Sequence, residues 1–223
     1  MPTFALIAEG ITDQAVIESV IREYYRARLG DEVDVNNLQP VRDATDEARV
    51  SGQGGWERVL EYCSFRDRIS EALSLNDYLV IQIDTDCGEQ KNFGVPLTSG
   101  GVERSVNDII VDVKGVIAQR LDNAFYELHR DRFIFAIAVH SLECWLLPLH
   151  AHTNSAKSRT LSCEHHLVLA LTKKDISYGK NYRSYKMISH GFNRIENIVM
   201  ASKHSKSFAI FLESLPDLSD ASV

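Results

Sequence analysis

The chain has 223 residues, of which 44% are hydrophobic and 25% charged, and its formal net charge is −7. A chain of this size can bury a full core, and it suits one globular domain with an appended element. The negative charge argues against broad electrostatic adhesion to nucleic acid, because that binding needs clustered Lys and Arg.

The sequence also bears on location and redox state. No apolar segment approaches the ~20 residues of a membrane-spanning helix, and the first residues lack the basic start of a signal peptide. We therefore expect a cytoplasmic protein without membrane association. Four scattered cysteines form no CxxC pair, which favours reduced structural thiols. They are Cys63, Cys87, Cys144 and Cys163.

The N-terminal part predicts two strands around one helix. Residues 4–8 form a continuous apolar run, typical of a buried strand. Thr12 is predicted to cap an amphipathic helix, which Gly30 is placed to end. Residues 33–41 alternate loosely and predict an edge strand. The polar, Gly-rich stretch 42–55 is interpreted as a loop.

The middle of the chain repeats this alternation of helices and strands. Residues 56–75 predict one helix with an apolar face, and residues 78–83 form a second buried strand. The Gly, Asn, Pro and Ser residues of 87–101 indicate a long loop, and loops of that length are uncommon without a functional reason. Residues 102–121 predict a helix, and residues 132–139 another buried strand.

The C-terminal part is predicted to be mostly helical. Residues 140–149 begin a helix or turn, and helices are expected over 164–171, 185–202 and 205–215. Strands that alternate with helices predict an α/β fold, in which a Rossmann-like, mostly parallel sheet is flanked by helices.

We expect one domain over residues 1–150 and a helical, basic extension over 151–223 that packs on the same domain. Between Lys173 and Lys206 the extension has eight Lys and Arg residues against two acidic ones. This segment could bind a nucleic-acid backbone, and a solvated helical face explains it equally well.

Acidic residues directly follow two of the buried apolar runs. Glu9 and Asp13 come after the first run, and Asp84 and Asp86 come after the run that ends at Ile83. The carboxyl ends of parallel strands meet at one edge of a sheet, where ligands bind in open α/β folds. Carboxylates gathered there repel one another unless a cation neutralises them, and Mg²⁺ prefers such oxygen ligands. The pattern predicts metal-assisted phosphate chemistry.

A third acidic element strengthens this interpretation. Glu143 lies within a turn of the end of the strand predicted at 132–139. Acidic residues that follow three separate strands are much less common by chance than one acidic residue after a single strand. Taken alone, the Asp84-Thr85-Asp86 segment is also typical of a helix cap, and Glu143 of a solvated first-turn residue. His140 precedes Glu143 and lies near the expected site.

These residues resemble a known domain. Glu9-Gly10-x-Thr12-Asp13 after one strand, followed by Asp84-x-Asp86 after another, is similar to the TOPRIM domain. Topoisomerases, bacterial primases, recombination mediators and OLD-family nucleases share that domain. The Ser141-Leu142-Glu143 element before Trp145, with a later lysine, resembles OLD-like phage-defence TOPRIM nucleases. The resemblance covers roughly residues 3–150.

The resemblance implies roles for individual residues. Glu9 would be a metal ligand or general base, and Asp84 and Asp86 would be the metal-binding pair. Asp13 and Glu143 would complete a second metal position. The metal would be Mg²⁺ or Mn²⁺, which polarises the scissile phosphate and lowers the pKa of bound water.

A lysine would stabilise the transition state of the reaction. Lys180 is our first choice and Lys186 the second. The resemblance also implies an anti-phage role. Because the chain has no Walker motif, a separate ATPase or another defence protein is an expected partner, and an oligomer is possible.

The leading hypothesis is therefore a metal-dependent nuclease that cleaves phosphodiester bonds of DNA or RNA. One alternative is a non-catalytic TOPRIM module that binds nucleic acid and a partner protein. Another is a different metal-dependent phosphotransfer enzyme, such as a phosphatase acting on a nucleotide.

Overall fold

A computed structural model describes residues 1–30, 32–41 and 55–218, so the loop predicted at 42–55 falls almost wholly outside the described residues. The fold is α/β, as predicted. Its main sheet has four parallel strands in the order β2-β1-β3-β6. These strands are β1 (Thr3–Ile7), β2 (Asp34–Gln39), β3 (Tyr78–Asp84) and β6 (Phe133–Ala138). The predicted edge strand is confirmed, since β2 stands at the end of this strand order, next to β1.

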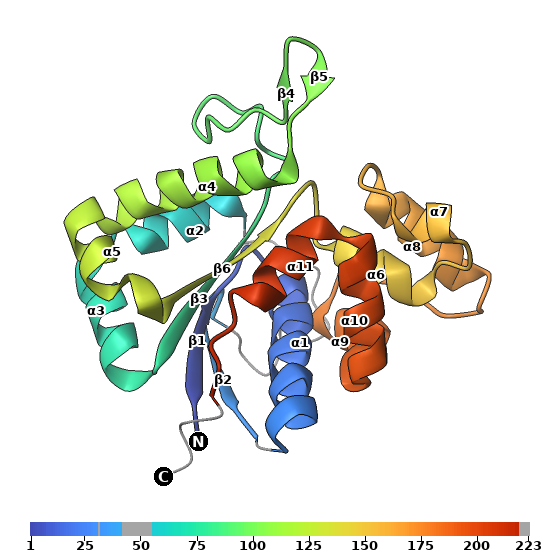
Figure 1. The fold of residues 1–223 in the computed structure, drawn as a ribbon, viewed down its shortest axis with the longest axis horizontal. Helices are drawn as coiled ribbons and strands as arrows, with labels where there is room; N and C mark the ends of the chain where they lie inside the picture. The colour runs from blue at the N-terminus through green and yellow to red at the C-terminus, as the bar shows by residue number, and fades with distance from the viewer. Residues whose placement is uncertain (31, 42–54, 219–223) are drawn as a thin grey trace.

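The sheet separates two hydrophobic clusters, because successive side chains of a strand point to opposite faces. In β1, Phe4 and Leu6 belong to one cluster, and Ala5 and Ile7 to the other. Helices cover both faces (Figure 1). Burial on both faces explains why β3 and β6 are almost continuously apolar in sequence.

Four helices cover one face: α2 (Trp56–Cys63), α3 (Arg66–Leu75), α4 (Val106–Leu121) and α5 (Asn123–His129). The single helix predicted at 56–75 is wrong, because the chain breaks at Ser64 and Phe65. Cys63 and Ile69 are six residues apart, so in one continuous helix their side chains would lie on different faces. The break lets both side chains reach the same cluster.

The helix predicted from residue 102 begins only at Val106, after the Ser105 side chain caps it. Before it, β4 (Thr98–Ser99) and β5 (Val102–Glu103) form a small antiparallel hairpin. Gly100 and Gly101 both have positive φ in its turn, a conformation that glycine adopts without strain. The hairpin projects from the body of the molecule (Figure 1).

The other face is covered by α1 (Ile11–Leu29) and the C-terminal helices. The prediction that Thr12 caps this helix is wrong, since Gly10 is the N-cap and Thr12 lies in the first turn. The prediction for the other end is confirmed, because Gly30 ends the helix in the left-handed conformation. The C-terminal helices are α6 (Glu143–His150), α7 (Asn154–Lys157), α8 (Cys163–Thr172), α9 (Tyr182–Ile188), α10 (Ile195–His204) and α11 (Lys206–Glu213).

The helices predicted at 164–171 and 205–215 correspond to α8 and α11. The helix predicted at 185–202 is wrong: a 3-10 turn, η3 (Ser189–Asn193), separates α9 from α10. Gly191 of this turn lies against Leu149, and a Cβ there would come within 3.2 Å of that side chain. A second 3-10 turn, η2 (Arg130–Arg132), precedes β6.

The C-terminal helices share one hydrophobic cluster with α1, β1 and β6. They pack directly on the sheet domain, while a domain boundary at residue 150 stays a prediction. No helix in the described part of the chain is long and apolar enough to cross a membrane.

Trp145 is central to this cluster, and its removal tests the packing. It is fully buried, stacks on Phe211, and donates a hydrogen bond of 2.9 Å from Nε1 to Ser207 Oγ. We expect Trp145→Ala to lower the free energy of unfolding by about 3–5 kcal/mol in urea denaturation. Leu128→Ala, at a side chain that is 76% exposed, should change it by less than about 0.5 kcal/mol. Equal effects of the two substitutions would contradict this packing.

Candidate functional site

The predicted acidic residues meet at the carboxyl edge of the sheet. Asp13, Asp84, Asp86 and Glu143 line one cavity of about 410 Å³, and Lys180 lines the same cavity. Asp13 lies in the first turn of α1, and Asp84 ends β3. Asp86 lies in the turn after β3, and Glu143 is the first residue of α6. The topology therefore gathers acids as far apart in the chain as Asp13 and Glu143.

Glu9, also a predicted site residue, does not belong to the lining of this cavity, and it links β1 to β3. Its Oε1 accepts a hydrogen bond of 2.7 Å from the Asp84 backbone N–H. Its own N–H donates to Gln82 Oε1 at 3.0 Å, and Gln82 Nε2 donates to Asp84 Oδ1 at 2.9 Å. Gln82 is the one polar residue within the apolar run of β3 and is fully buried. That interruption was the sequence signal for its role, and our prediction did not use it.

Asp84 joins the sheet to the segment that contains Glu143. Its Oδ2 accepts a hydrogen bond of 3.1 Å from the Leu142 N–H, one residue before α6 begins. Both of its carboxylate oxygens therefore already have protein partners. Asp84 thus positions the start of α6, and with it Glu143, at the edge of the cavity.

His140 holds the turn between β6 and α6. It has a φ of 66°, which is uncommon for a non-glycine residue. Its N–H donates to Thr85 Oγ1 at 2.8 Å, and its carbonyl accepts from the Asp86 N–H at 2.9 Å. Its ring Nε2 lies 3.0 Å from Glu103 Oε1, so the β4–β5 hairpin is tied to the cavity wall.

A chain of hydroxyl and carboxyl groups links Glu143 to Lys180. The Tyr185 hydroxyl donates to Glu143, and it lies 2.8 Å from the Tyr178 hydroxyl. Tyr178 in turn donates to Glu164 at 3.0 Å, and Glu164 pairs with Lys180 Nζ at 2.9 Å. The sequence prediction missed Tyr178, Tyr185 and Glu164, because no local pattern indicates which helices pack around Glu143.

The structure separates the two candidate lysines. Lys180 lies at the acidic cavity, and its hydrogen bond to Glu164 raises its pKa. Lys186 lines a different cavity, and its Nζ is 3.8 Å from Glu18 Oε1. Of the two, only Lys180 is placed to act on a ligand of the acidic cavity.

The carboxyl groups make the site strongly electronegative. Burial and the charge of Asp13 raise the pKa of Glu9 to about 8, and burial and the charge of Glu143 raise the pKa of Asp13 to about 7. Burial, followed by the charge of Asp13, raises the pKa of Asp84 well above its ordinary value. Burial also raises the pKa of Asp86, which Lys180 and His140 oppose. An added cation would stabilise the ionised forms of all four groups.

The donor chemistry of the site fits a hard divalent cation. The predicted ligands are all carboxylate oxygens, the type that Mg²⁺ and Mn²⁺ prefer. Over residues 1–30, 32–41 and 55–218, no three His, Cys, Asp or Glu side chains are arranged closely enough to hold a metal ion. Hydrogen bonds turn Glu9 and Glu143 toward Asp84 and Tyr185. Convergence of these oxygens on one ion stays a prediction.

A disulfide closes one wall of the cavity. Cys144 and Cys163 form a disulfide, and their Cα atoms are 5.1 Å apart. Cys144 directly follows Glu143, and Cys163 directly precedes Glu164. The prediction of reduced thiols is wrong for this pair, because the packing of α8 on α6 joins residues that are 19 positions apart. It is confirmed for Cys63 and Cys87, which are free and buried.

Comparison with known proteins returned no match to this chain among family models, curated proteins or solved structures.

The raised carboxyl pKa values make the stability of the metal-free protein depend on pH. In the folded state Glu9 keeps its proton up to about pH 8 and Asp13 up to about pH 7. The unfolded chain releases both protons near pH 4. In that window the folded state binds more protons, so stability falls as the pH rises. We expect the melting temperature in EDTA to drop by several degrees from pH 5 to pH 8, since each kcal/mol shifts it by about 2–4 °C.

Differential scanning fluorimetry of two variants checks this dependence. Glu9→Gln should flatten the slope, because it removes a titrating group from the site. Asp131→Asn should leave the slope unchanged, since that side chain is 98% exposed. A melting temperature that rises between pH 5 and pH 8 would show that other groups dominate.

Proposed function

We propose that this protein is a metal-dependent nuclease that hydrolyses phosphodiester bonds of DNA or RNA. One observation carries the proposal: five carboxylates, from α1, the end of β3 and the turn after it, α6 and α8, line a single cavity together with a lysine. Such a cavity holds excess negative charge, which a divalent cation would offset while leaving room for a phosphate group. The cavity of about 410 Å³ lies in the size range of ligand sites.

Asp13, Asp84, Asp86 and Glu143 would hold Mg²⁺ or Mn²⁺, and Glu9 would hold the Asp84 backbone in place. When bound, such an ion polarises the scissile phosphate and lowers the pKa of a bound water molecule. Gln82 and the Leu142 N–H would fix the carboxylate of Asp84 during turnover. Lys180 would leave Glu164 and stabilise the negative charge that develops on the phosphate.

The biological context rests on the resemblance to OLD-like TOPRIM nucleases. It supports a role in anti-phage defence, together with a separate ATPase or another defence protein as partner. The parallel α/β sheet with acids at its carboxyl edge is consistent with that resemblance.

A non-catalytic module is the second candidate. It is favoured by the internal hydrogen bonds of Glu9, Asp84 and Glu143, which satisfy these carboxylates without a metal. Such a module would bind nucleic acid or a partner protein without cleaving it. A phosphatase that acts on a nucleotide would instead turn over small phosphoesters and leave polynucleotides intact.

The first test is cleavage of labelled single- and double-stranded DNA and RNA with Mg²⁺ or Mn²⁺. We expect Asp84→Asn to lower the rate by at least about a hundredfold, because it weakens cation binding and disturbs the position of Glu143. Asp131→Asn should keep the parental rate, since Asp131 is exposed and remote from the cavity. Cleavage by Asp84→Asn at the parental rate would refute the proposal.

A second test concerns the lysine of the cavity. Lys180→Ala should lower the cleavage rate by about 10²–10³-fold, as the loss of one transition-state donor typically does. Lys180→Arg should recover part of the rate, because it restores the positive charge. Lys186→Ala should lower the rate much less, as Lys186 lies outside the acidic cavity. If both alanine variants lose the same activity, the assignment of Lys180 is wrong.

A further inference from the structure

The disulfide between Cys144 and Cys163 joins two helices that line the acidic cavity. Cys144 lies in the first turn of α6, directly after Glu143, and Cys163 is the first residue of α8, directly before Glu164. Cys163 itself lines the cavity, as Glu143 and Glu164 do. The bond therefore holds the start of α8 beside the start of α6 at the cavity.

An exposed segment of the chain covers the two sulfur atoms. The Thr160 carbonyl oxygen lies 3.3 Å from Cys144 Sγ, and the Arg159 carbonyl oxygen lies 3.3 Å from Cys163 Sγ. Both carbonyls belong to a run, residues 158–162, in which every residue is exposed. A segment without buried side chains opens locally at a low free-energy cost. A small reductant can therefore reach the bond although both cysteines are buried.

The residue before Cys163 has a strained backbone conformation. Ser162 is the N-cap of α8, and its φ of 53° lies in the left-handed region. Its side chain makes no capping hydrogen bond in the described chain. Such a conformation is costly for a residue other than glycine, and it persists where neighbouring contacts enforce it. The disulfide at the next residue is such a contact, so its opening would let the start of α8 relax.

The later turns of α8 are anchored independently of the disulfide. Leu167 and Leu171 lie about one and two turns after Cys163. Both leucines are fully buried in the hydrophobic cluster that α8 shares with α1 and the sheet. The first turn of α8 can therefore move while the rest of the helix keeps its place in the core.

Glu164 lies in this first turn and links α8 to Lys180. It accepts a hydrogen bond of 3.0 Å from the Tyr178 hydroxyl, and it pairs with Lys180 Nζ at 2.9 Å. While the disulfide is closed, Glu164 therefore holds the lysine of the acidic cavity. A displaced first turn would take Glu164 away from Lys180 and leave the ammonium group to an anionic ligand.

We propose that this disulfide is a redox switch that controls whether Glu164 holds Lys180. A dithiol opens it: one thiolate of the dithiol attacks Cys163 Sγ, the S–S bond breaks, and Cys144 leaves as a thiolate. The second thiol of the reductant then attacks the mixed disulfide and releases Cys163, which closes the reductant's own disulfide. The reductant loses two electrons and two protons, and both cysteines end as thiols. The switch does not require the acidic cavity to be catalytic.

Thiol labelling of the folded full chain tests whether the bond opens. The protein is treated with dithiothreitol, separated from it, and alkylated with N-ethylmaleimide without denaturant before mass spectrometry. We expect Cys144 and Cys163 to be labelled only after reduction, while the buried Cys63 stays unlabelled. The proposal fails if the pair is labelled only in denaturant, or if circular dichroism shows that reduction unfolds the protein.

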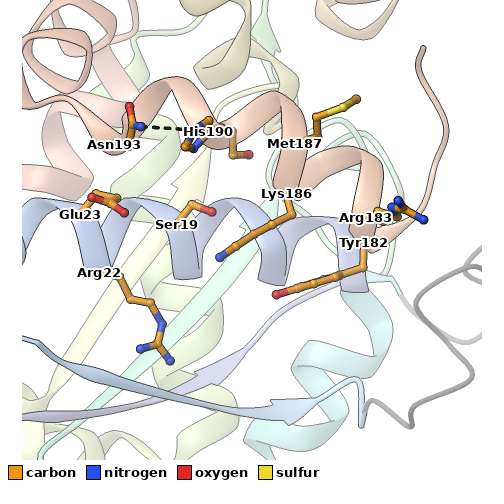
Figure 2. A pocket seen from close by; sticks show the side chains of 10 residues that line it. Ser19, Arg22, Glu23, Tyr182, Arg183, Lys186, Met187, His190 and Asn193 are labelled. Carbon is orange, nitrogen blue, oxygen red and sulfur yellow. Dashed lines mark hydrogen bonds between the residues drawn. The ribbon is translucent and has the colours of Figure 1, made fainter. Parts of the chain in front are cut away.

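Lysine footprinting tests the link to the cavity. Reduction should raise the rate of Lys180 acetylation by N-hydroxysuccinimide acetate at least about threefold, because an amine without its carboxylate partner is deprotonated more easily. Lys186 is a matched control: it also pairs with a glutamate, but it lies at another cavity, between α1 and α9 (Figure 2). Its rate should not change. Equal changes at the two lysines, or none at Lys180, would overturn the link.

Variants separate the disulfide from other effects of the reductant. Cys144→Ser with Cys163→Ser removes the bond, so Lys180 should react at the rate of the reduced protein with or without dithiothreitol. Cys63→Ala with Cys87→Ala keeps the bond, so Lys180 should keep its full response to reduction. A response that survives the first pair of substitutions, or disappears with the second, would rule out the disulfide as its cause. Neither result bears on cleavage, which is measured with metal present.

Discussion

The position of Asp84 depends on hydrogen bonds from three directions, and the rest of the site is built around it. Its N–H donates to Glu9, its Oδ1 accepts from Gln82, and its Oδ2 accepts from the Leu142 N–H. These contacts tie β1, β3 and the start of α6 together at one edge of the sheet. Because buried polar groups need partners, a change in any of these groups would disturb the others.

The charges at this edge work against the stability of the metal-free fold. Glu9, Asp13 and Asp84 are poorly solvated and close to one another, and burial is the largest cause of their raised pKa values. A protein under selection for stability alone would replace such groups with apolar ones. Buried acids with perturbed pKa values at a sheet edge, where ligands bind in open α/β folds, are typical of functional sites.

The C-terminal helices complete the site and also separate it from the cavity at Lys186. Helix α9 contributes Tyr185 to the acidic cavity and Lys186 to the other one. The Cys144–Cys163 disulfide and the tyrosine pair hold α8 and α9 near the start of α6. One short helix therefore borders both cavities.

The sequence by itself determined the parallel α/β sheet and the edge at which the acids would gather. Strands buried on both faces are continuous apolar runs, and the residue that follows such a run must lie at the edge of the sheet, as Glu9 does after β1. The helix breaks at Ser64 and at η3 were not predictable, because they depend on which faces pack against the sheet.

Tertiary structure alone decided how the long-range partners combine. The disulfide between α6 and α8, the contact of Tyr185 with Glu143, and the separation of Lys180 from Lys186 all follow from helix packing. No local pattern encodes these contacts, since a side chain finds its distant partner only through the relative placement of whole helices.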